Sequence, residues 1–64
     1  DEREKLRHLV RHWKAHNAEH AEVYREWAAV MKDLGEDAIS SILLDIAEQT
    51  VKLDPAFEDI ERRL

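Results

Sequence analysis

The fold is decided by one stretch, residues 3–34, which reads REKLRHLVRHWKAHNAEHAEVYREWAAVMKDL and contains neither glycine nor proline. Mostly bulky side chains recur in it at alternating steps of four and three residues, the spacing of a heptad-like helical seam. The seam consists of Leu6, Val10, Trp13, Asn17, His20, Tyr24, Trp27, Met31 and Leu34. The pattern predicts one helix of about 32 residues, roughly 48 Å long, with something packed along all of it.

The rest of the chain predicts two shorter helices. Gly35 follows the first helix and is a natural C-terminal stop, because glycine adopts the left-handed conformation at little cost. Helical spacing of apolar residues then predicts a second helix over residues 37–53. Asp54 and Pro55 have the residue types of an N-cap and a first helical position, so either a short third helix starts here or the second helix kinks and continues. We favour a separate short helix over residues 55–63.

These elements predict an all-α domain covering residues 1–64, a long helix with an antiparallel second helix and a short C-terminal helix. A chain of 64 residues buries only a modest core by itself. We therefore expect two copies to dimerise into a helical bundle.

The amino-acid composition excludes several classes of partner. Acidic residues outnumber basic ones by 15 to 10, and the net charge of -5 argues against nucleic acid, whose phosphates select for clustered Lys and Arg. There is no cysteine, which excludes disulfides and thiolate ligands. The sequence shows no apolar run long enough to cross a membrane, so we expect a soluble, cytoplasmic protein with no membrane partner.

The residues that point to chemistry are four histidines at one spacing: His8, His12, His16 and His20. Each step of four drifts by about 40° on an ideal helix, so the four rings cannot all bind one ion, but neighbouring pairs can bind Zn, Ni or Cu. His16 and His20 form the best pair, since His20 is expected near the centre of the buried seam. We predict a divalent metal site, nickel or zinc, with His12 as third ligand.

The remaining ligands would come from a carboxylate, such as Asp45 or Glu48 of the second helix, or from a second chain. An alternative needs no metal. His20 and Asn17 would then form a buried, hydrogen-bonded polar layer in a protein-protein interaction or oligomerisation module. Spacing alone leaves both interpretations open. We expect no enzyme, because so short a helical chain offers little cleft for a nucleophile or an acid–base pair.

A longer motif runs through residues 12 to 28: His12-Trp13, His16-Asn17, Glu19-His20-Ala21-Glu22 and Tyr24-x-x-Trp27-Ala28. It resembles a small helical domain of unknown function in bacterial and archaeal proteins, with the pattern H-W-x-x-H-N-x-E-H-A-E-x-aromatic-x-x-W-A. That domain can follow a CooT-type nickel-binding module. The resemblance implies a role in handling nickel or another transition metal, carried by His12, His16 and His20, with a metal-handling partner protein.

Overall fold

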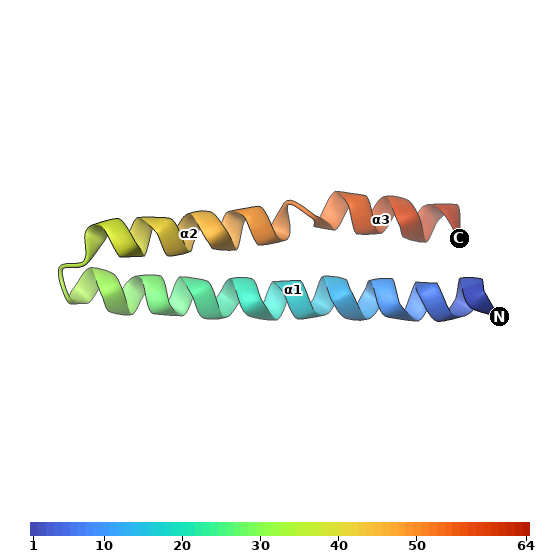
Figure 1. Cartoon of the computed structure of the whole chain (residues 1–64), viewed down its shortest axis with the longest axis horizontal. Helices are drawn as coiled ribbons and strands as arrows, with labels where there is room; N and C mark the ends of the chain where they lie inside the picture. Colours follow the sequence, from blue (N-terminus) through green and yellow to red (C-terminus); the bar gives the residue numbers. More distant parts are fainter.

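The chain folds into a long, narrow helical hairpin, and the predicted all-α class is confirmed (Figure 1). The computed structural model describes all residues, 1–64. It contains α1 (Glu2–Asp33), α2 (Asp37–Val51) and α3 (Asp54–Arg63), with principal extents of 51 × 14 × 10 Å. These bounds lie within two residues of the predicted ones. Both termini lie at the same end of the hairpin, opposite the turn.

Both ends of α1 are stabilised by local hydrogen bonds. At its start, the carboxylate of Asp1 accepts from the backbone N–H groups of Arg3 and Glu4, at 2.7 and 3.1 Å. At its end, Gly35 adopts φ +79°, and the N–H groups of Gly35 and Glu36 donate to the carbonyls of Lys32 and Met31. This is the Schellman arrangement, and it reverses the chain within three residues.

The second arm of the hairpin differs from the prediction of an independent third helix. In Figure 1, α3 continues roughly along the line of α2 after a break at residues 52–53, so the arm is one bent helix. Pro55 causes the break, because it has no N–H to donate and its ring collides with the carbonyl four residues earlier. Asp54 is the first residue of α3 rather than its N-cap, and Leu53 occupies the cap position without a side-chain hydrogen bond.

The two arms meet along small side chains rather than along the predicted bulky ones. Five residues are buried: Val10, Ala21, Ala28, Ser40 and Ala47. Together with half-buried neighbours they define the inner seam of α1, which consists of Arg7, Val10, Lys14, Asn17, Ala21, Tyr24, Ala28 and Met31. The facing inner seam of the second arm consists of Ser40, Leu43, Ala47, Thr50, Asp54, Phe57, Glu61 and Leu64.

The predicted seam of α1 was therefore half wrong. It shares Val10, Asn17, Tyr24 and Met31 with the inner seam, but four of its other five positions lie one residue before a member of that seam. Trp13, His20, Trp27 and Leu34 are exposed, and the residues that follow the first three of them face α2 and α3 instead. Two of these positions are alanines, Ala21 and Ala28, whose small side chains let the two helices approach closely. The hydroxyl of Ser40 accordingly donates to the carbonyl oxygen of Ala28 at 2.7 Å.

Polar and aromatic contacts attach α3 to the first half of α1. The rings of Trp13 and Phe57 pack with centroids 6.4 Å apart and planes inclined by 46°. The Lys14 ammonium lies 3.3 Å from a carboxylate oxygen of Glu61 and 3.9 Å from one of Glu58. These contacts fix the bend of the second arm against α1.

None of the three helices is long and apolar enough to cross a membrane.

We expect Gly35→Ala to destabilise the hairpin by about 1 kcal/mol, because an L side chain is strained at this left-handed φ. Thermal unfolding followed by circular dichroism would measure the loss. Gly35→Asn should lose less, since asparagine tolerates this conformation better. Equal losses in the two variants would contradict the explanation.

Ala28→Leu should cost about 1–3 kcal/mol, because its Cβ lies in the buried contact with the second arm, where a larger side chain forces the helices apart. Urea unfolding would report the change. Ala29→Leu, one residue further on an exposed face, is the matched control and should change stability little. Tolerance of leucine at residue 28 would show that the arms are not closely packed there.

Candidate metal centre

All four histidines lie on exposed positions of α1, outside the contact with the second arm. The expectation that His20 lies at the centre of the buried seam is wrong, because the neighbouring Ala21 takes that place. The four histidines are thus attached to one rigid helix, and their exposed rings are accessible to ions or to another molecule.

His16 and His20 converge as predicted for the best pair. Their Nε2 atoms are 3.1 Å apart, and the ring centroids are 4.4 Å apart with planes inclined by 69°. One Nε2–H donates to the lone pair of the other Nε2, and the tautomers decide which ring is the donor. The arrangement requires one ring to carry its proton on Nε2 and the other to leave Nε2 free.

This separation also suits two ligands of one metal ion. With Zn–N bonds of about 2.0–2.1 Å, two nitrogens at neighbouring corners of a tetrahedron lie roughly 3.3–3.4 Å apart. The observed 3.1 Å is close to that edge. To bind one ion, both rings would have to turn so that their Nε2 lone pairs point at the ion rather than at each other.

The outer histidines do not join this pair. The ring of His12 stacks on that of His16, with centroids 5.8 Å apart and planes inclined by 10°. On the other side, Tyr24 stacks on His20 at 6.0 Å and 19°. Nowhere do three His, Cys, Asp or Glu side chains gather in a way that could hold a metal. One chain therefore presents two converging ligands, and His12 is a neighbour of the pair.

The carboxylates predicted to help do not reach the pair either. Glu48 of α2 lies 3.6 Å from the ammonium of Lys52, and neither it nor Asp45 forms a ligand group with the histidines. Asn17 lies on the inner seam, half-buried, while His20 is exposed. The predicted buried layer of Asn17 and His20 is thus absent within one chain, because the two residues lie on different faces of α1.

The histidine pair lies within a second heptad pattern that the sequence analysis missed. We call it the outer stripe of α1, and it consists of Leu6, Leu9, Trp13, His16, His20, Val23, Trp27 and Val30. Every member directly precedes a residue of the inner seam, and the large apolar members Leu9, Trp13, Val23, Trp27 and Val30 are 41–55% exposed. A count of all residues at steps of three and four would have separated the two patterns.

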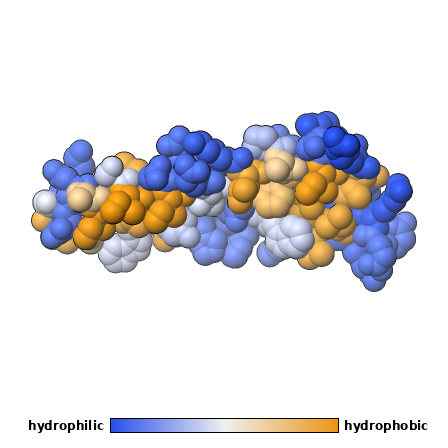
Figure 2. All heavy atoms as spheres, turned by 45° about the horizontal axis from the view of Figure 1, so that its top comes forward, coloured by the Kyte–Doolittle hydropathy of each residue, from blue (hydrophilic) through white to orange (hydrophobic).

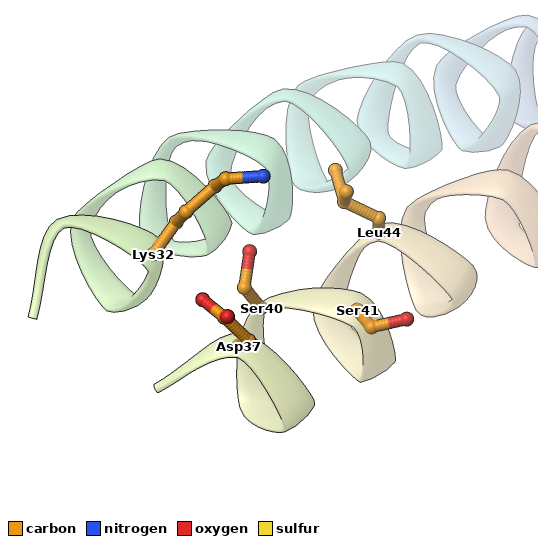
Figure 3. A pocket seen from close by; sticks show the side chains of 5 residues that line it. All are labelled: Lys32, Asp37, Ser40, Ser41 and Leu44. Atoms are coloured by element: carbon orange, nitrogen blue, oxygen red, sulfur yellow. The ribbon is translucent and has the colours of Figure 1, made fainter. Parts of the chain in front are cut away.

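A shallow pocket of about 210 Å³ lies near the hairpin turn, far along α1 from the histidines (Figure 3). It is lined by Lys32, Asp37, Ser40, Ser41 and Leu44. The Ser40 hydroxyl is already bonded to the carbonyl of Ala28, and no histidine lines the pocket to act as a base. Nothing in it resembles an activated nucleophile.

Residues 6–64 match the family model described as a domain of unknown function (DUF8180). No curated protein and no solved structure matches the chain. The description of this family names no nickel-binding module, so the role implied by the motif in residues 12 to 28 stays a prediction.

Proposed function

This chain belongs to the DUF8180 family, a domain of unknown function. From the geometry of its side chains, we propose that it binds a divalent transition-metal ion through His16 and His20. The observation that carries the proposal is the 3.1 Å separation of the two Nε2 atoms on neighbouring turns of one helix. The helix fixes the backbone positions from which both rings project, which lowers the cost of bringing two ligands together.

The donor set selects the class of ion. Imidazole nitrogen suits zinc, nickel and copper, whereas calcium and magnesium require oxygen ligands. The chain has no cysteine to favour thiolate-dependent sites. We therefore propose zinc or nickel as the bound ion, in a binding protein rather than an enzyme, with a metal-handling protein as its physiological partner.

Two imidazoles leave the coordination shell open, and there are two sources for the rest. His12 is the nearest further imidazole on the same helix, since its ring stacks on that of His16. To bind the same ion, it would have to change its side-chain rotamer, for which its exposed position leaves room. A second chain is the other source.

The alternative function is an oligomerisation or interaction module without metal. It is favoured by the many large apolar side chains left exposed on both arms, among them Trp27 at 55% and Ile42 at 60%. The hydrogen-bonded imidazoles of His16 and His20 would then be a polar layer inside an apolar interface. A chelator distinguishes the two functions, because removing a bound ion lowers the melting temperature by mass action and leaves a metal-free module unchanged.

We expect isothermal titration to show heat on adding zinc, nickel or copper at micromolar protein. The double variant His16→Ala, His20→Ala should bind at least about a hundredfold more weakly, because both nitrogen ligands are lost. His8→Ala is the matched control on the same helix and should leave the affinity unchanged. Absence of heat with the unaltered chain, or unchanged heat with the double variant, would count against metal binding.

The affinity should fall steeply below about pH 6, because protons compete with the metal for the imidazole nitrogens. With two imidazoles involved, the loss should approach about a hundredfold per pH unit once both are protonated. Zinc titrations between pH 7.5 and pH 5 would measure it. An affinity that is constant over this range would exclude the histidine pair as the site.

A further inference from the structure

We infer that a second copy of this chain packs antiparallel on the outer stripe of α1 and completes the metal site with its own His16 and His20. The ion would then have four imidazole ligands, two from each chain. This inference rests on the proposed function and names the partner that the site requires.

The first argument is that the site in one chain is half complete. A structural zinc site has four ligands and a catalytic one at least three, whereas only His16 and His20 converge here. The chain has no cysteine to contribute. The chemically simplest source of two further imidazoles at matching geometry is the same pair in another copy.

The second argument is that the hairpin exposes one largely apolar side, which His16, His20 and Gln49 interrupt near its middle. The second arm has its own outer stripe, again one residue before its inner seam: Ile39, Ile42, Ile46, Gln49, Leu53, Ala56 and Ile60. A one-residue offset turns a side chain by about 100° on an ideal helix. Because the two arms run in opposite directions, this equal offset turns both outer stripes to the same side of the hairpin.

Figure 2 shows one side of the hairpin, with apolar atoms in a band along much of its length and hydrophilic atoms near its middle. The Cα extents of 51 × 14 Å correspond to a face of about 700 Å² before side chains widen it, close to the roughly 800 Å² per partner of a stable complex. Within one chain, only five of 64 residues are buried, and Val10 is the largest fully buried side chain. A second copy would supply the missing core.

The third argument is the symmetry of the outer stripe of α1. Its spacing reads the same in both directions about residue 18, midway between His16 and His20. A two-fold axis there places His16 opposite the partner's His20. It also places Trp13 opposite the partner's Val23, and Leu9 opposite the partner's Trp27. Each large ring thus meets a smaller side chain, and the four imidazoles meet at the axis.

The fourth argument is charge, which selects the antiparallel orientation. Residues 1–17 contain five basic and three acidic side chains, a formal charge of +2. Residues 18–34 contain two basic and four acidic side chains, a formal charge of -2. Antiparallel packing sets each half of α1 against the half of opposite sign, whereas parallel packing sets like against like.

The test combines sedimentation analysis with zinc titration. The chain should be a dimer that binds one zinc ion per two chains, and His8→Ala should alter neither result because His8 is not one of the four ligands. Trp27→Glu, on the outer stripe, should give a monomer that binds zinc at least tenfold more weakly. Ala29→Glu, exposed on another face of α1, is the matched control and should remain a dimer with the same stoichiometry.

Cysteine pairing in the presence of a chelator tests the orientation without metal, because the native chain has no cysteine. Leu6→Cys chains mixed with Val30→Cys chains should oxidise mainly to the mixed disulfide, since these positions face each other across the axis. Two homodisulfides, or none, would overturn the antiparallel contact.

The two proposals fail in different ways. A zinc-bound monomer, or one ion per chain, overturns the shared site and leaves the proposed function standing. A dimer that forms the mixed disulfide but takes up no zinc overturns the proposed function and, with it, the four-imidazole site. If His12→Ala abolishes zinc binding, the third ligand comes from the same chain, and the site with two imidazoles from each of two chains is overturned.

Discussion

The rest of the structure depends on the close contact between α1 and α2, where Ala21, Ala28, Ser40 and Ala47 are buried and the Ser40 hydroxyl reaches the backbone of Ala28. Small side chains allow two helices to lie near each other along their length. This contact sets the rotation of α1 about its own axis. By using the alanines one residue after His20 and Trp27, it turns the histidine pair and Trp27 away from the second arm, whereas Trp13 still packs against Phe57 of α3.

That rotation explains why the candidate site is open. Had the bulky seam been buried as the spacing first predicts, His20 would have been enclosed and forced to find a hydrogen-bond partner inside the chain. Exposed on a rigid helix, His16 and His20 have only each other within hydrogen-bond distance. The proposed metal binding and the proposed second copy both rest on this exposure. The polar members of the outer stripe would bind the ion, and its apolar members would contact the second copy.

Much of this molecule could be predicted from local sequence signals. The absence of glycine and proline over residues 3–34, the stop at Gly35 and the break at Pro55 predict three helices with bounds within two residues of those observed. A step of four also makes His16 and His20 neighbours, but it does the same for His12 and His16, and the buried position of His20 that singled out the first pair is not observed. The resemblance in residues 12 to 28 and the domain of unknown function matched by residues 6–64 add a family, and the chemistry still rests on the two imidazoles.

The sequence by itself determined where the helices begin and end and which histidines are neighbours, because hydrogen bonds within one turn and backbone restrictions at glycine and proline are local effects. Only the tertiary structure decided which of two interleaved heptad patterns α2 and α3 cover, and that the second arm is bent rather than split. Both patterns satisfy the same helical period. The choice between them depends on how closely two helices can pack, and that is a property of the pair of helices rather than of either sequence segment alone.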